Sequence, residues 1–219
     1  MNREPSARER MLARIRERQG KPPEPQAAEI EAVRAHLAAH PRNPAPRDVF
    51  DPLTRFRERA LTLASTLDEV QTVEGVPAAV ARYLAEHNLG TRAVSWPELG
   101  ELDWSAAGLH VEARSARDDD LVGITGALCA IAETGTLVTL TGRATPPTVS
   151  LLTETHIAVV RAARVVRAME DAWALVREAG GMPRAVNFIS GPSRTADIEQ
   201  TVTLGAHGPY RVHIVLVSA

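Results

Sequence analysis

The sequence predicts an α/β protein with a mostly parallel sheet flanked by helices, preceded by an N-terminal helical extension. A chain of 219 residues has room for one large domain and an extension. From residue 70 onward, short apolar runs typical of strands alternate with helical segments, as in a largely parallel sheet. Before residue 49, prolines recur between charged segments. We therefore expect residues 1–48 to form the helical extension and a Pro-rich linker, and residues 49–219 to form the α/β domain.

Two helices are expected in the extension. The first spans residues 6–18 and carries a thin apolar stripe of Met11, Leu12 and Ile15 among arginines and glutamates. A helix this short is not stable alone, so we expect it to dock on its own domain or on a partner. Prolines on both sides confine the second helix to residues 27–39.

The elements of the α/β domain follow from the spacing of apolar residues. Helices are predicted over residues 53–67 and 76–86, and the clearest one over residues 162–176, with a stop at Gly180 and Gly181. Strands are predicted over residues 70–73, 92–96, 111–113, 121–125, 136–141, 157–160, 184–189 and 212–217.

Composition argues against several classes of protein. The formal net charge of −2 is unsuited to a protein that grips nucleic acid through its phosphates. No apolar run approaches the roughly 20 residues of a membrane span, and no secretory signal is visible, so a cytoplasmic location is expected. The sequence has a single cysteine, Cys129, which allows no disulfide and no cysteine-ligated iron–sulfur cluster within the chain. We expect it to be a buried small side chain.

The segment over residues 127–136 is the first candidate for chemistry. It places Glu133, Thr134, Gly135 and Thr136 directly before an apolar strand. Glycine lets the backbone approach a ligand, the threonines offer hydroxyls and amides to an anion, and the carboxylate is a candidate base or nucleophile. The alternative is a turn glycine beside a solvated glutamate.

A second candidate follows a predicted strand, where ligands bind in parallel α/β sheets. The strand ends at Ser190 and Gly191, and Ser193 or Thr195 is placed to cap a helix that we expect to begin there. Free amides at a helix start attract anions, and Arg194 suits a carboxylate or phosphate.

Three further polar residues each allow a structural or a functional interpretation. Asp197 either complements the dipole of the expected helix or orients Arg194. His207 stands between glycines before Gly208, either beside a ligand or in a tight turn. His156 is interpreted as a hydrogen-bonded structural residue, and the sequence assembles no metal site.

Three of these stretches resemble a known family. The runs AIAETGT at 130–136, NFISGPSRTADIE at 187–199 and GAHGP at 205–209 are similar to the signature segments of the lactate-utilisation protein C family, which carries the LUD domain. The resemblance covers residues 121–217 closely and the rest of the chain loosely. One departure is Thr153-Glu154-Thr155, a segment in which the family often has a proline.

The resemblance implies a fold like that of CoA transferases, ribose-5-phosphate isomerase and 5-formyltetrahydrofolate cyclo-ligase. It also implies oxidation of L-lactate to pyruvate together with two iron–sulfur partner proteins. The clusters are then expected on the partners, with no cofactor in this chain.

Two main hypotheses remain open on sequence. In the first, the chain is an accessory or substrate-binding subunit, in which Arg194 and backbone amides around Gly135, Ser193 and Gly208 hold a small carboxylate or phosphate-bearing ligand. Glu133 or His207 then handles a proton. In the second, it is a stand-alone transferase, isomerase or ligase that acts on a CoA, sugar-phosphate or folate-type substrate through Glu133. A regulatory ligand sensor is a third possibility.

Overall fold

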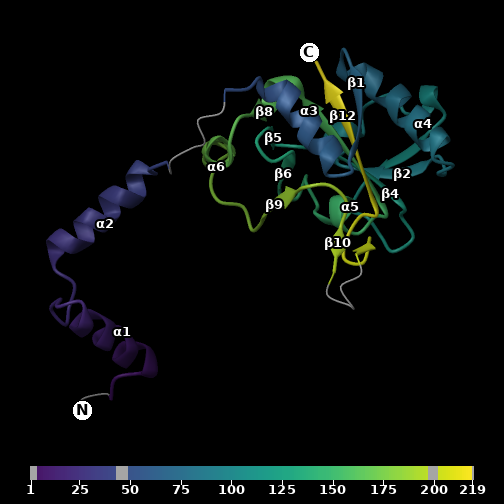
Figure 1. The fold of residues 1–219 in the computed structure, drawn as a ribbon. Coiled ribbons are helices and arrows are strands. Elements are labelled where there is room, and N and C mark those ends of the chain that lie inside the picture. The colour runs from purple at the N-terminus through teal and green to yellow at the C-terminus, as the bar shows by residue number, and fades with distance from the viewer. Residues whose placement is uncertain (1–3, 43–48, 197–201, 219) are drawn as a thin grey trace. The chain divides into compact units, whose positions relative to one another are not determined.

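The computed structural model describes residues 4–42, 49–196 and 202–218, and the chain divides into two compact units, Met1–Asp48 and Val49–Ala219 (Figure 1). The first unit holds α1 (Ala7–Arg18) and α2 (Ala27–Ala39), which confirms both helices expected there. Ser6 and Glu9 cap α1 reciprocally, each side chain bonding the other's backbone N–H. Arg16 and Lys21 form ion pairs with Glu29, at 2.8 and 2.7 Å, and so tie the two helices together.

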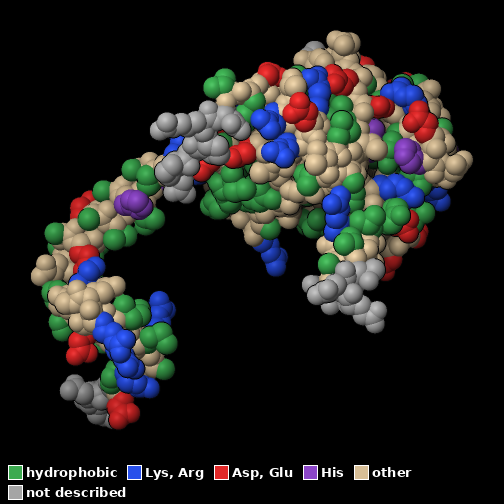
Figure 2. Space-filling model, in the orientation of Figure 1, with side chains coloured by type: hydrophobic (Ala, Val, Ile, Leu, Met, Phe, Trp, Pro, Cys, Tyr) green, Lys and Arg blue, Asp and Glu red, His purple; other side chains and the backbone are tan. Residues whose placement is uncertain are grey.

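Neither helix of the first unit buries a side chain. The apolar stripe of Met11, Leu12 and Ile15 on α1 is exposed, as are Ile30, Val33 and Leu37 on α2. In Figure 2 hydrophobic and basic side chains reach the surface side by side on these helices. Docking of α1 on its own domain or on a partner therefore stays a prediction.

The second unit is built on a six-stranded sheet in which every neighbouring pair is parallel. The order across the sheet is β1-β12-β7-β4-β2-β3. The strands are β1 (Thr66–Val70), β2 (Arg92–Ser95), β3 (His110–Ala113), β4 (Val122–Gly126), β7 (Thr155–Arg161) and β12 (Arg211–Val217). This arrangement confirms the predicted mostly parallel α/β fold.

A smaller sheet and a two-stranded ribbon complete the strands of this unit. The smaller sheet has the order β8-β5-β6-β9, and its strands are β5 (Cys129–Ile131), β6 (Thr136–Leu140), β8 (Val165–Val166) and β9 (Val186–Ile189). The ribbon pairs β10 (Arg194–Thr195) with β11 (Thr203–Leu204).

Alternating side chains of the central strands fill two cores. Ile157 and Val159 of β7 face a core that includes α4 (Val76–Glu86), whereas Ala158 and Val160 face a core that includes α3 (Pro52–Thr62) and part of the smaller sheet. A third core lies between the smaller sheet and α6 (Met169–Glu178). Both faces of the central sheet are thus covered, as parallel sheets require.

After the adjacent strands β2 and β4, the chain continues toward opposite edges of the sheet. From β2 the chain passes outward to β3, whereas from β4 it passes to β7 on the other side. A short helix, α5 (Thr148–Leu151), precedes β7. This divergence is a topological switch point, and at such points a crevice opens at the carboxyl ends of the strands.

Two predicted helices had wrong boundaries. The helix expected over 53–67 ends at Thr62, because the chain turns at Ala64, whose φ is +64°, and β1 begins at Thr66 rather than at residue 70. The helix expected over 162–176 begins only at Met169. Before it, Val165 and Val166 pair with Ala130 and Ile131, so β-branched side chains that resembled a helix face instead extend the smaller sheet.

Replacement of Gly135 by alanine is expected to destabilise the second unit by roughly 2–4 kcal/mol. Gly135 has a φ of +67°, and a Cβ atom there would lie 2.7 Å from the carbonyl carbon of Arg59 in α3, which is backbone and cannot move aside. Urea denaturation checks the loss. Gly108→Ala is the matched control, because Gly108 has a φ of +74° but nothing within 4 Å of the same position. Equal losses in the two variants would contradict the packing argument.

Candidate functional site

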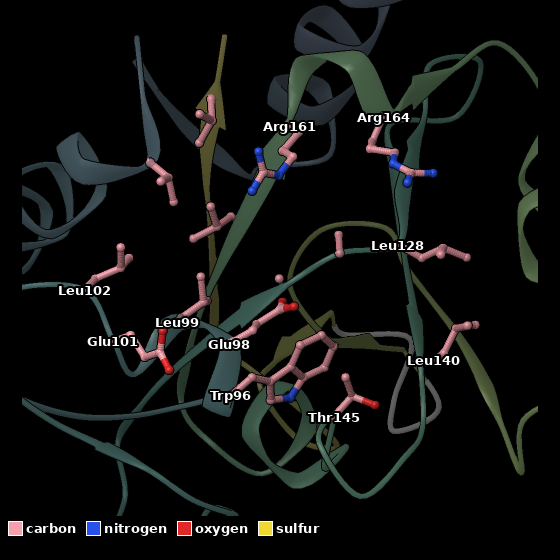
Figure 3. A pocket seen from close by; sticks show the side chains of 15 residues that line it. Trp96, Glu98, Leu99, Glu101, Leu102, Leu128, Leu140, Thr145, Arg161 and Arg164 are labelled. Atoms are coloured by element: carbon pink, nitrogen blue, oxygen red, sulfur yellow. The ribbon is translucent and has the colours of Figure 1, made fainter. Parts of the chain in front are cut away.

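A cavity of about 680 Å³ lies at the carboxyl edge of the central sheet, at the switch point (Figure 3). Its lining comes from residues that end or follow four neighbouring strands: Trp96 after β2, Gly126 at the end of β4, Arg161 at the end of β7 and Val217 at the end of β12. No local motif joins these residues. The order of the strands alone brings them together.

Two arginines form one wall of the cavity. Arg161 is the last residue of β7, and Arg164 ends the 3-10 turn that follows, so the side chains are three residues apart on one ridge. Both are exposed, and neither makes a hydrogen bond or ion pair with any residue in the described part of the chain. The charge of Arg161 does reach Glu74, whose pKa it helps to lower after the larger effect of a hydrogen bond with Thr72.

Glu98 lies on the other side of β4. Its carboxylate packs directly over the Cα of Gly126, where a Cβ atom would overlap it, and it makes no hydrogen bond with the described residues. The neighbouring Trp96 is buried and donates its indole N–H to the Pro146 carbonyl, at 3.1 Å. Figure 3 shows Glu98 pointing into the space below Arg161 and Arg164.

This arrangement suits the binding of an anion. Guanidinium groups without protein partners retain all their donors for a carboxylate or phosphate, and a forked contact adds direction to the attraction. Apolar side chains, among them Leu99, Leu102, Leu128 and Leu140, also line the cavity.

Many of the residues predicted from sequence gather elsewhere, around the C-terminal end of α3. Hydroxyl groups of Thr134, Thr136 and Ser190 form a chain, with oxygen–oxygen distances of 2.8 and 2.7 Å. Gly135 packs on the α3 backbone as described, and Gly191, with a φ of +78°, packs on the Leu63 carbonyl. The close approach that these two glycines permit in this structure is to the end of α3.

The expected helix does not begin after Ser193, because Arg194 and Thr195 form β10. A helix capped by Thr195 would fall largely on residues 197–201, which lie outside the described residues. Arg194 donates to the Leu63 carbonyl at 2.7 Å, at the negative end of a helix dipole rather than at a positive one. The backbone amides of Gly135 and Ser193 donate to the carbonyls of Ile131 and Pro209. These amides are therefore occupied in this structure.

Other predicted residues lie apart from the cavity. Gly208 packs against Ser193, His207 is exposed beside it, and Asp197 falls outside the described residues. Glu133 lies in the turn between β5 and β6, five residues beyond Leu128 of the cavity lining. Glu133 is not among the residues that line the cavity, so chemistry by Glu133 stays a prediction.

The buried groups His156 and Cys129 do not line the cavity. His156 is fully buried with its Nε2 2.8 Å from the Thr125 hydroxyl, as its interpretation as a structural residue requires. Cys129 is buried as expected, and burial raises the pKa of its thiol to about 11. Among residues 4–42, 49–196 and 202–218, no group of three His, Cys, Asp or Glu side chains is placed to hold a metal ion. None of the helices described is both long and apolar enough to cross a membrane.

Comparison with known proteins gives a consistent result. The LUD domain matches residues 65–217. A "Lactate utilization protein C" of Bacillus subtilis (strain 168) is 31% identical over 160 residues, which is 69% of this chain and 66% of that protein. The protein of the same name from an Exiguobacterium species is 37% identical over 143 residues, 63% of this chain and 61% of that relative. The chain thus spans slightly less than two thirds of the length of these relatives.

A solved structure resembles the chain as well. The crystal structure of a DUF162 family protein from Deinococcus radiodurans superposes with a TM-score of 0.56 at 26% identity. The match covers 76% of this chain and 96% of that one.

Proposed function

The chain belongs to the LUD domain family, and from this premise we propose that it acts in lactate utilisation by binding a small carboxylate at the switch-point cavity. Two relatives that align over about two thirds of this chain carry the name lactate utilization protein C. We further propose that it works with two iron–sulfur proteins, which carry the clusters and accept the electrons, while this chain holds the substrate.

One observation carries the placement of the substrate. Arg161 and Arg164 are the cationic side chains of the cavity lining, and both lack ion-pair partners among the described residues. A carboxylate is the group that such a pair binds best in a three-carbon hydroxy acid, because each guanidinium donates in a fork that matches two carboxylate oxygens.

The double variant Arg161→Ala, Arg164→Ala is expected to lower lactate-dependent activity at least tenfold. Loss of a charge-assisted hydrogen bond costs about 1.5–3 kcal/mol, which is roughly tenfold or more in binding. The measurement is anaerobic dye reduction by L-lactate with the two iron–sulfur partners, with and without this chain.

The control is Arg92→Ala, because the Arg92 side chain is 81% exposed and its ion pair with Glu112 is long, at 4.0 Å. Activity in the double variant equal to that of Arg92→Ala would contradict the assignment of the cavity. Dye reduction that proceeds equally without this chain would contradict the role in lactate oxidation.

A further inference from the structure

A small carboxylate on the arginines leaves the other half of the cavity without a ligand. Arg161 ends β7 and Glu98 follows β2, and β4 lies between these strands, paired with both. The backbones of β7 and β2 are thus about 10 Å apart, at two strand spacings of about 4.8 Å, and the Glu98 carboxylate lies over β4 between them. A three-carbon acid on the arginines also fills only a small part of a cavity of about 680 Å³.

The glutamate side has properties of its own. Glu98 and Glu101 line it together with Leu99 and Leu102, and Glu98 has no hydrogen-bond partner in the described part of the chain. The absence of a side chain at Gly126 gives the Glu98 carboxylate its position over β4. A cavity of about 680 Å³ is also within the range, roughly 300–1,000 Å³, that holds ligands the size of a drug.

We propose that this cavity binds a phosphate ester that carries neighbouring hydroxyl groups, of the class of a sugar phosphate or a nucleoside monophosphate. The phosphate contacts Arg161 and Arg164, whose two positive charges match its charge of about −2. The hydroxyl groups donate to the Glu98 carboxylate, which accepts two hydrogen bonds from adjacent hydroxyls. The phosphate takes the place of the small carboxylate on the same two arginines, so the two ligands compete, and this inference rests on the cavity named in the proposed function but not on the lactate reaction.

A hydroxyl-bearing end fits this wall better than an ammonium group. Leu99 and Leu102 adjoin the glutamates, and an ammonium ion loses more hydration free energy beside leucine side chains than a hydroxyl does.

Isothermal titration calorimetry of the full chain tests the proposal with five probes: ribose 5-phosphate, AMP, ribose, inorganic phosphate and 6-aminohexanoate. We expect at least one of the two esters to bind tenfold or more tightly than inorganic phosphate, and ribose to show no binding. The double variant Arg161→Ala, Arg164→Ala is expected to lose binding of ester and phosphate alike. Glu98→Gln is expected to weaken ester binding about tenfold and to leave inorganic phosphate unchanged.

Gly126→Ala provides a second test of the glutamate. Its Cβ atom displaces the Glu98 carboxylate, which is the end of an exposed, flexible side chain, so the fold is retained while the carboxylate moves. It is expected to reproduce the effect of Glu98→Gln. Gly90→Ala, with nothing within 4 Å of the added atom, is the control.

Three results would overturn the proposal: failure of both esters to bind, tighter binding of 6-aminohexanoate than of the esters, or equal ester affinity in Glu98→Gln and the parent protein. If the esters fail while the arginine variant still loses lactate-dependent reduction, this inference falls and the proposed function stands. If the esters bind and lactate-dependent reduction does not require the chain, the reverse holds.

Discussion

Lowering the pH from 6.5 to 4 is expected to reduce the free energy of unfolding of the second unit by roughly 5 kcal/mol. Two buried histidines cause this loss. Burial lowers the pKa of His156 from 6.5 to about 4, and burial, partly opposed by the charge of Asp68, lowers the pKa of His213 to about 4. The unfolded chain therefore binds two protons near pH 6.5 that the folded chain does not accept until about pH 4.

The contacts of the two rings explain why they stay neutral when folded. His156 Nε2 lies 2.8 Å from the Thr125 hydroxyl, and its Nδ1 is buried without a hydrogen-bond partner. His213 Nδ1 lies 2.9 Å from the Thr66 hydroxyl, and its ring stacks on Tyr83 with centroids 3.9 Å apart. Protonation would place a charge in each of these buried sites. The free energy of unfolding therefore falls by up to about 1.4 kcal/mol per histidine for each pH unit between 6.5 and 4.

Urea denaturation at pH 7.5, 6.5, 5.5 and 4.5 measures the slope. His156→Gln and His213→Gln are each expected to halve it, whatever their effect on stability at pH 7.5, because one titrating group is removed. His207→Gln, at an exposed site, is the control and should leave the slope unchanged. If the slope were as steep in both buried-site variants as in the parent protein, groups other than these two histidines would cause the acid sensitivity.

Gly123→Ala is expected to destabilise the second unit by about 3 kcal/mol or more. Gly123 lies in β4, in the interior of the central sheet, and a Cβ atom there would overlap the Val149 carbonyl oxygen and lie 2.9 Å from the Thr153 hydroxyl. The same carbonyl accepts a hydrogen bond from the Thr153 side chain at 3.1 Å. Relief of the overlap would require α5 to move away from the sheet.

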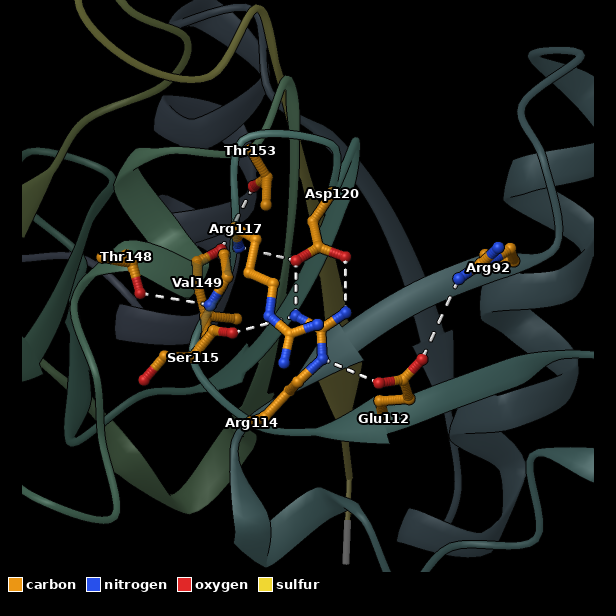
Figure 4. A network of polar contacts seen from close by, with 10 residues as sticks. Arg92, Glu112, Arg114, Ser115, Arg117, Asp120, Thr148, Val149 and Thr153 are labelled. Carbon is orange, nitrogen blue, oxygen red and sulfur yellow. Dashed lines mark hydrogen bonds and ion pairs between the residues drawn. The ribbon is translucent and has the colours of Figure 1, made fainter.

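The surroundings of α5 resist that movement. The Ala116 backbone amide donates to Thr148 at 3.2 Å, and Asp120 accepts two hydrogen bonds from Arg114, at 2.6 and 2.9 Å, which brace the same loop (Figure 4). Urea denaturation at pH 7.5 compares Gly123→Ala with Gly90→Ala, whose added atom has nothing within 4 Å. A loss below about 1 kcal/mol for Gly123→Ala would mean that α5 adapts easily.

The fold was predictable wherever local pattern and tertiary packing agree. Helix α4 begins and ends at the predicted residues, because its apolar face at helical spacing is also the face buried against the sheet. The segment before α6 was not predictable. Val165 and Val166 fit a helical stripe, but their pairing with β5 depends on a partner strand 35 residues away in the sequence.

The candidate site was harder to predict for a related reason. Compact runs of glycine and hydroxyl residues stand out in the sequence, and Thr136 and Ser190 do come together, but around a helix end. Trp96 and Glu98 follow one strand, and Arg161 ends another. They meet only because of the order of those strands in the sheet, which no local sequence motif predicts. A charged residue directly after a predicted strand was the one available signal.

The position of β12 has a consequence for the order of folding. Residues 211–217 form the strand between β1 and β7, and β1 has no other strand partner among the described residues. Until β12 pairs with it, β1 is an unpaired edge, open to mispairing. Closure of the sheet joins Thr66 to His213, far apart in the sequence, and such non-local pairing is slow, so β1 stays exposed for most of the folding reaction.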